Sequence, residues 1–426
     1  MDGVGSLSPF TCTFATRVEQ LHIESSRTLR HSIHGKVLPM TSEERHAARR
    51  KRREIARKEK RQKAVAPYDC YENVISAQSL LRAARQSKKT VAWKASVQRY
   101  MANLLRNTWD LRKRLLNGIS VAMGFICFTL CERGKMRHIR SVHFKERVVQ
   151  RSVCDNALVP VLGRSLVYEN GASMKGKGIH FHVFLCSRQL HRFYRQNHFS
   201  NEGWILQIDF SGYFDNIQHP PLKQMILQAF QDRRLRWLIW QFVKSFGKES
   251  LGIGSQVSQI LAVSYPNRID HYAREVLGLN LSGRYMDDSY YMHASREYLQ
   301  YCLEKMRPMF DELGIRLNPR KTQIIPIKRF TFLKTRFYLT EKGKVVLKPC
   351  AASITRNRRK LKAFSRMLES GEMTIEGIIN SYASWYGYQN HLDAHKSLRE
   401  MDKLFYELFH IWPTHRKKRK RKVFYR

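Results

Sequence analysis

The chain has 426 residues, which is long for one compact domain and predicts two or three folding units. Its 43% hydrophobic and 11% aromatic residues can bury a sizeable core, which excludes a wholly disordered protein. Against 35 acidic residues stand 77 Lys and Arg, a formal net charge of +42 that favours a polyanionic partner. Nucleic acid is the first candidate, before an anionic membrane or a merely solvated basic surface.

Two basic runs lie near the ends of the chain. Residues 45–63 hold eleven basic and two acidic residues, and residues 415–426 hold eight basic residues and no acidic ones. Removing both runs still leaves a net charge of +25, so the excess is spread through the body as well. We interpret residues 1–66 as a basic, partly disordered N-terminal arm and 415–426 as a basic tail.

The arm contains one clear helix signal. The stretch "TSEER" after Met40 combines a capping residue with an acidic first turn, which predicts the start of a helix. Residues 1–39 lack periodicity, and we expect either that they are loosely ordered or that Met40 is the true start.

The eight cysteines contain no CxxC pair and no Cys/His cluster, which argues against a zinc site and a disulfide framework. No signal-peptide pattern is visible, and the longest apolar stretch, residues 119–131, is shorter than a membrane span. We therefore expect a cytoplasmic protein.

Residues 70–118 show helical periodicity, and Asn117-Gly118 predicts where it stops. Strand-like residues follow over 121–144, with "ERGK" as a hairpin turn, and a helix is predicted from about residue 145. The Gly- and Lys-rich residues 171–178 predict a loop that lacks the ending of a nucleotidase P-loop.

A buried strand is predicted at residues 203–210, followed by helices around 221–245 and a loop that enters a helix over 251–278. One face of this last helix carries an apolar stripe, made of Leu261, Tyr265, Ile269, Tyr272 and Val276. Pro266 should kink or interrupt this helix.

The remaining chain predicts a helix over 296–313, strand-like runs at 323–327, 330–339 and 344–348, and then helices up to the basic tail. Strands and helices mix without regular βα alternation, which predicts an α+β fold.

Three carboxylates stand out. Asp209 ends the apolar run "WILQID", while Asp287 and Asp288 stand side by side in "RYMDDSYY" after another strand-like piece. If the two strands are neighbours, the carboxylates converge at one edge of a sheet and repel one another unless cations are present. Two Mg²⁺ ions would offset this charge and support an in-line phosphoryl displacement. For a lone Asp-Asp pair, an ordinary polar turn is the alternative.

A series of motifs follows in chain order: "GKMRHIRSVHFKERVVQ" (134–150), "NGASMKGKG" (170–178), "DFSGYFDNI" (209–217), "IGSQVSQ" (253–259), "YMDD" (285–288), "LNPRKT" (317–322) and "FTFLK" (330–334). Through these motifs, residues 90–410 resemble the reverse transcriptases, in which similar motifs occur in the same order. Ile253 and Gln259 stand where many members have Gln and Pro, and this form resembles the bacterial diversity-generating, defence-associated and unclassified retroelement enzymes.

The resemblance implies roles for individual residues. Asp209, Asp287 and Asp288 would hold two metal ions, Mg²⁺ with Mn²⁺ as an alternative, and Lys321 would protonate the leaving pyrophosphate. Phe214 would exclude a ribose 2′-hydroxyl, a role for which its neighbour Tyr213 is the rival. The remaining implied contacts are Lys135, Arg137 and Arg140 for the triphosphate, Ser255, Gln256 and Gln259 for the nucleotide or template, Tyr285 and Met286 for the primer end, and Phe332, Leu333 and Lys334 for the primer grip.

The resemblance also implies a right-hand polymerase fold. Fingers are expected at residues 67–200, a palm with an antiparallel sheet at 201–345, including a helical insertion near 220–250, and a helical thumb at 346–414.

The implied function is that of an RNA-directed DNA polymerase that extends a 3′-hydroxyl with dNTPs on an RNA template, in the bacterial cytoplasm. Anti-phage defence or an unclassified retroelement is favoured over diversity generation. Expected partners are a structured non-coding RNA, the cDNA product, and an accessory protein or a second copy of the chain. The rival functions are an untemplated or protein-primed DNA polymerase and a catalytically silent RNA-binding protein.

Overall fold

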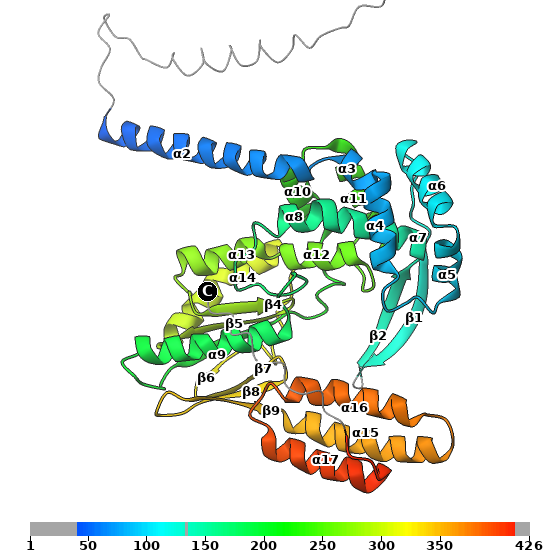
Figure 1. The fold of residues 1–426 in the computed structure, drawn as a ribbon. Helices are drawn as coiled ribbons and strands as arrows, with labels where there is room; N and C mark the ends of the chain where they lie inside the picture. Colours follow the sequence, from blue (N-terminus) through cyan, green and yellow to red (C-terminus); the bar gives the residue numbers. More distant parts are fainter. Residues whose placement is uncertain (1–40, 133–134, 414–426) are drawn as a thin grey trace, which may run out of the picture. The chain divides into compact units, whose positions relative to one another are not determined.

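The computed structural model describes residues 41–132 and 135–413, without the side chains of Glu132 and Lys135 (Figure 1). The expected loose segment 1–39 and the basic tail 415–426 lie outside the described residues, as does the centre of the expected "ERGK" turn. The chain divides into two compact units, the first ending at Ala66 and the second beginning at Pro67.

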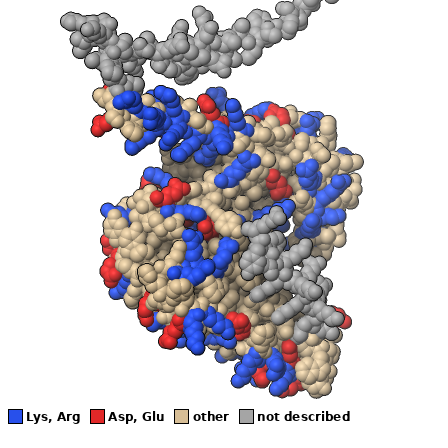
Figure 2. Space-filling view, turned by 60° about the vertical axis from the view of Figure 1, so that its left-hand side comes forward, with Lys and Arg blue, Asp and Glu red and all other residues tan. Residues whose placement is uncertain are grey.

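The described part of the first unit is the helix α2 (Ser42–Val65). Its start is the cap expected from "TSEER". The Glu44 N–H donates to Thr41 Oγ1 at 3.3 Å, and the Thr41 N–H donates back to the Glu44 carboxylate at 2.8 Å. Nearly all its side chains are exposed, and Figure 2 shows basic side chains along its length. Packing against a core therefore contributes little to this helix.

The second unit begins with α3 (Tyr71–Ile75), α4 (Ala77–Ser87), α5 (Ala95–Ala102) and α6 (Leu104–Leu116). The helical region expected over 70–118 is thus present but broken three times, at Ser76, over the turns at 88–94 and at Asn103. Ser76 is the cap of α4, accepting from the Ser79 N–H at 3.2 Å, and Asn103 separates α5 from α6 with a non-helical ψ of 45°.

The hairpin of β1 (Phe125–Glu132) and β2 (Lys135–Val142) follows, antiparallel, with Phe128 opposite Ile139. Its base is attached to the loop before α12: the Arg140 N–H donates to the Ile253 carbonyl at 3.0 Å. A Cβ on Gly254 would lie 2.5 Å from the Arg140 carbonyl oxygen, and Gly254 has φ +127°, so glycine is required there. The chain continues through α7 (Phe144–Val153), a π-helical turn and α8 (Val159–Leu162).

The central sheet has the strand order β4-β5-β3-β6, and every neighbouring pair is antiparallel. Its strands are β3 (Trp204–Asp209), β4 (Ser282–Tyr285), β5 (Asp288–His293) and β6 (Gln323–Pro326). One face packs against α9 (Ile179–Gln196), and α14 (Arg296–Glu312) covers the other (Figure 1). The expected strand at 203–210 is therefore the centre of the sheet.

A second antiparallel sheet, β7-β8-β9, consists of β7 (Arg329–Phe332), β8 (Thr335–Leu339) and β9 (Val345–Pro349). Its apolar side chains join α9 and the central sheet in one core, in which Phe337 and Tyr290 are fully buried.

Four helices lie between β3 and β4 in the chain: α10 (His219–Ala229), α11 (Arg233–Lys244), α12 (Gln256–Ser264) and α13 (Asn267–His271), the last continued by a π-helical turn, Tyr272–Val276. Pro266 separates α12 from α13, as expected from its missing N–H. The predicted apolar stripe is wrong at its end, because Val276 is 66% exposed. Pro266 and the wider π turn shift the register, so Ala273 and Leu277 are buried instead.

The chain ends with three helices, α15 (Ala351–Glu369), α16 (Ile375–Gln389) and α17 (His395–Phe409). They share a core of their own, built on Leu361, Tyr382 and Phe405. Helices and antiparallel sheets together confirm the α+β expectation. Among the described helices, none combines the length and apolar character that crossing a bilayer requires.

Candidate active site

Three carboxylates meet at one end of the two inner strands of the central sheet, β3 and β5. Asp209 is the last residue of β3 and lies directly opposite Asp288, the first residue of β5. Residues directly opposite in an antiparallel pair have Cβ atoms about 4.5–5.5 Å apart. Asp287 belongs to the two-residue turn of the β4–β5 hairpin, and its carbonyl accepts from the Phe210 N–H at 3.3 Å. The structure thus brings together the three residues that the sequence singled out.

The hairpin turn is held by a buried arginine. Met286 has a left-handed φ of 57°, which is unfavourable for a side chain of this size. Arg284, 3% exposed, donates from Nη1 to the Met286 carbonyl at 3.2 Å and from Nη2 to the Val263 carbonyl at 2.8 Å. It also forms a bidentate ion pair with Asp270, with contacts of 2.6–2.9 Å. Our sequence reasoning missed Arg284, although its place directly before "YMDD" was a usable signal.

Burial and the neighbouring negative charges make Asp287 and Asp288 hard to ionise. Burial raises the pKa of Asp288 to about 7, and the charges of Asp287 and Asp209 contribute. The pKa of Asp287 is raised first by burial and also by Asp209, against the opposing charges of Lys321 and Arg137. The cluster therefore holds more negative charge than its surroundings compensate.

Lys321 and Asn318 contact Asp209 from the loop after α14. Lys321 Nζ lies 2.7 Å from Oδ1, and Asn318 Nδ2 donates to Oδ2 at 3.1 Å. Burial opposes the charge of Lys321, but the hydrogen bond and the charge of Asp209 outweigh it and raise its pKa. Asn318 stands in the motif "LNPRKT" but was not among the predicted site residues; its N–H also donates to the Asp209 carbonyl at 2.8 Å.

The carboxylates suit divalent cations in kind, since hard ions prefer oxygen ligands. As they stand, however, no three His, Cys, Asp or Glu side chains of the described residues form a group that could hold a metal ion. Both oxygens of Asp209 contact Lys321 or Asn318 instead. A metal ion bound to Asp209 would therefore share these oxygens with Lys321 and Asn318 or displace them.

The basic residues of the hairpin separate onto its two faces. Arg137 lies opposite Leu130, and its charge lowers the pKa of Asp287, so it faces the carboxylates. Arg140 lies on the other face and donates from Nη1 to the Phe246 carbonyl at 3.0 Å. The structure therefore brings Arg137, but not Arg140, to the site. The side chain of Lys135 lies outside the described residues.

Two adjacent aromatic rings follow Asp209. Tyr213 is buried, and its hydroxyl donates to the Ala262 carbonyl at 2.5 Å. Phe214 is only half-buried, with its ring centroid 5.8 Å from that of Tyr213. Of the two rivals, Phe214 is thus the one with an accessible ring edge.

The loop before α12 places its polar residues differently. Ser255 is 1% exposed; its hydroxyl donates to Gln150 Oε1 at 2.8 Å and accepts from the Ser258 N–H at 3.3 Å, so it caps the helix. Gln256 is partly buried and Gln259 is exposed. Direct contact with a ligand is open to these two glutamines, not to Ser255.

The expected primer-side residues belong to two hairpin turns: Tyr285 and Met286 directly precede Asp287, whereas Phe332, Leu333 and Lys334 lie at the β7–β8 turn. Tyr285 packs edge-on against His182, with ring centroids 5.6 Å apart, and the buried Phe332 packs against Tyr290 at 4.8 Å. Between β7 and β8, Leu333 and Lys334 form a two-residue turn with left-handed φ values of 46° and 62°.

That turn is tied to α16. The Tyr388 hydroxyl donates to the Leu333 carbonyl at 3.0 Å and lies 3.2 Å from Thr335 Oγ1. A strained turn is maintained only where its surroundings determine it.

An antiparallel sheet edge that gathers three carboxylates beside a lysine is the kind of site that metal-dependent nucleotidyltransferases use. Residues 131–337 match the family model described as reverse transcriptase (RNA-dependent DNA polymerase). This stretch contains all three aspartates and Lys321, so the residues gathered at the site lie within the part of the chain that is similar to reverse transcriptases.

Other proteins share parts of the chain. It is similar to Protein YkfC of Escherichia coli K12, with 24% identity over 171 residues, which is 38% of this chain and 43% of YkfC. The chain thus matches less than half the length of this relative. Two solved telomerases are also similar: that of Candida albicans with a telomeric RNA fragment (TM-score 0.44, 12% identity, 69% of this chain and 56% of that one) and that of Candida tropicalis (TM-score 0.42, 13% identity, 72% and 63%).

Proposed function

We propose that the protein extends a 3′-hydroxyl with dNTPs on an RNA template, with chemistry at Asp209, Asp287 and Asp288. The observation that carries this proposal is the convergence of the three carboxylates at the β3–β5 edge, with the pKa of Asp288 raised to about 7. Such a cluster is costly to hold together, and bound divalent cations would remove that cost.

Asp209, Asp287 and Asp288 would hold two divalent ions, Mg²⁺ before Mn²⁺. When bound, these ions supply charge neutralisation for in-line phosphoryl transfer. Lys321 keeps its proton at neutral pH because its pKa is raised, so it can donate a proton to the leaving pyrophosphate once it releases Asp209.

Arg137 would contact the triphosphate, because it already faces Asp287 and a guanidinium matches phosphate oxygens. Phe214 would exclude the ribose 2′-hydroxyl by its half-buried ring. Gln256 and Gln259 would contact the nucleotide or template. Tyr285 and Met286 would flank the primer end, with Phe332, Leu333 and Lys334 as the primer grip.

In this proposal residues 67–200 are the fingers, 201–345 the palm and 346–414 the thumb. Residues 1–66 form the basic arm, which would bind a structured RNA through its phosphates. The "IGSQVSQ" form is shared by the diversity-generating, defence-associated and unclassified bacterial retroelement enzymes. The biological role proposed is anti-phage defence or an unclassified retroelement, with diversity generation as the alternative.

The test is primer extension by the full chain on an RNA template with dNTPs, in the presence of Mg²⁺ or of a chelator. Asp287→Ala and Asp288→Ala should each lower the rate at least about a thousandfold, because the ions lose a ligand. The control Asp311→Ala removes an exposed carboxylate on α14 and should extend normally.

Two outcomes would contradict the proposal. Undiminished extension by both variants would remove the carboxylates from the chemistry. Product of unchanged length and sequence after omission of the RNA template would show untemplated synthesis.

A further inference from the structure

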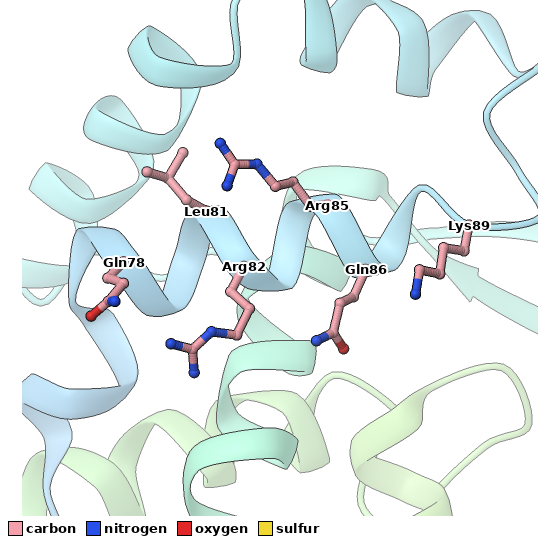
Figure 3. A pocket seen from close by; sticks show the side chains of 6 residues that line it. All are labelled: Gln78, Leu81, Arg82, Arg85, Gln86 and Lys89. Atoms are coloured by element: carbon pink, nitrogen blue, oxygen red, sulfur yellow. The ribbon is translucent and has the colours of Figure 1, made fainter.

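A hollow on α4 combines three cations with amide side chains. It has a volume of about 370 Å³ and is lined by Gln78, Leu81, Arg82, Arg85, Gln86 and Lys89 (Figure 3). Arg82, Arg85 and Lys89 are exposed, and no acidic residue contributes to the lining. Arginine and lysine heads with nearby amides are donors suited to phosphate oxygens.

The charge around the hollow is one-sided. Residues 77–119 contain ten Lys and Arg residues and a single acidic residue, Asp110. A protein partner would need a strongly acidic surface to match this segment, whereas a polynucleotide supplies negative charge at every residue. On the face drawn in Figure 2, Lys and Arg likewise recur over the surface.

Exposed tryptophans accompany these cations. Trp93 follows Lys89 by four residues through consecutive turns, is 74% exposed, and has Lys94 Nζ 5.5 Å from its ring centroid. Trp109 on α6 is 59% exposed, with the Arg112 guanidinium 5.5 Å from its ring. Rings of this size left open to solvent offer stacking platforms for bases, and unpaired bases have free faces to stack.

We propose that the α4 surface, defined as the hollow of α4 together with Trp93, binds single-stranded RNA without reading its sequence. Phosphates would contact Arg82, Arg85 and Lys89, and a base would stack on Trp93. The hollow is lined only by residues 78–89, and none of them is among the residues proposed for catalysis; Gln86 accepts a hydrogen bond from Arg151 of α7. The choice of RNA over DNA rests on the proposed function, in which RNA is the template.

The test measures the affinity of the full chain for an unstructured, fluorescently labelled RNA 20-mer at increasing KCl concentration. Arg82→Gln, Arg85→Gln and Lys89→Gln are combined in one variant. For single strands each lost phosphate contact lowers the slope of log K against log salt by about 0.7, so this variant should lose about two units. The control combines Lys223→Gln, Lys305→Gln and Arg307→Gln, which removes the same charge from exposed positions of α10 and α14.

Trp93 is tested by a matched pair. Trp93→Ala should weaken RNA binding about fivefold to a hundredfold, while Trp93→Phe, which retains a stacking ring, should bind nearly as the unmodified protein does. Circular dichroism of each variant checks that α4 and its neighbours remain folded.

Several results would overturn the proposal: equal salt slopes for the two triple variants, equal loss in Trp93→Ala and Trp93→Phe, or an equal effect on duplex RNA. Tighter binding of a single-stranded DNA 20-mer would also overturn it. Extension of a short RNA–primer hybrid is measured alongside and should be unchanged in all variants. If the unmodified protein fails to extend, the proposed function falls, while the binding comparison still decides this proposal.

Discussion

At the tip of the β4–β5 hairpin, Asp287 and Asp288 lie beside Asp209, and their repulsion adds to the effect of burial. Two positive charges oppose this repulsion: Lys321, which contacts Asp209, and Arg137, whose charge acts on Asp287. The site is therefore arranged so that added positive charge stabilises it.

This arrangement predicts an unusual pH dependence in the metal-free protein. The pKa of Asp288 rises from 3.8 to about 7 on folding, so the folded state binds more protons than the unfolded state between these values. The free energy of unfolding should thus fall as pH rises from about 4 to about 7, by about 1–3 kcal/mol after allowance for coupling among the carboxylates. Urea denaturation in chelator at pH 5 and pH 8 measures this fall.

Asp288→Asn should remove most of the fall, because it cannot ionise, whereas Asp311→Asn should not. Mg²⁺ should restore stability at pH 8 in the unmodified protein only. Parallel pH profiles for the unmodified protein and Asp288→Asn would refute this account.

Arg284 is expected to act by positioning the Met286 carbonyl, without touching a substrate. Arg284→Met leaves Asp270 buried and uncompensated, which should cost about 3–5 kcal/mol of stability. Adding Asp270→Asn should recover much of that stability. It should not recover kcat in primer extension, because the turn still lacks its donor.

Thermal unfolding and steady-state kinetics on the single and double variants separate the two effects. Recovery of both stability and kcat in the double variant would show that Arg284 serves the core alone.

At the scale of elements, the sequence was most informative about strands and turns whose limits are marked by neighbouring residues. The ends of β3 and the β4–β5 hairpin followed from short apolar runs that stop at aspartates. The contacts by which Arg284 holds the hairpin turn could not be predicted, because its partners Val263 and Asp270 come from a separate helical segment. Arg140 was grouped with Arg137 because sequence proximity does not reveal which face of a hairpin a residue takes. Val276 was misplaced because a π turn changes the helical period.

The β7–β8 turn yields a prediction at this scale. Tyr388→Phe removes the hydroxyl that contacts Leu333 and Thr335, and should destabilise the protein by about 1–2 kcal/mol. If this turn grips the primer, the KM for the primer should rise more than kcat falls. Tyr406→Phe, on the 41% exposed Tyr406 of α17, is the control and should change neither value. A lower melting temperature with an unchanged KM would leave the turn a structural role only.

At the scale of the whole molecule, the basic charge was predictable from composition, but the secondary structure of the segment that carries much of it was not. Residues 45–63 had no apolar face from which to infer a packed helix, yet they form the continuous α2. A capping box, an acidic first turn and good helix formers are sufficient local causes. The division into fingers, palm and thumb stays a prediction.

The basic arm predicts a salt-sensitive contribution to RNA binding. Changing Arg49, Arg50, Lys51, Arg52 and Arg53 to Gln keeps helix formers while removing five charges. The slope of log K against log salt for a structured RNA should fall by about 3 to 5 units. Extension of a short RNA–primer hybrid should be unaffected. An unaltered slope would mean that α2 does not contact RNA phosphates.

The attachment of the β1–β2 hairpin has a mechanical consequence. Arg140 bonds through its N–H to Ile253 and through its guanidinium to Phe246, and only glycine fits at position 254 beneath it. Arg137 lies three residues away from this point on β2. A side chain introduced at position 254 would collide with the Arg140 backbone, so we expect it to misalign Arg137 without touching the aspartates.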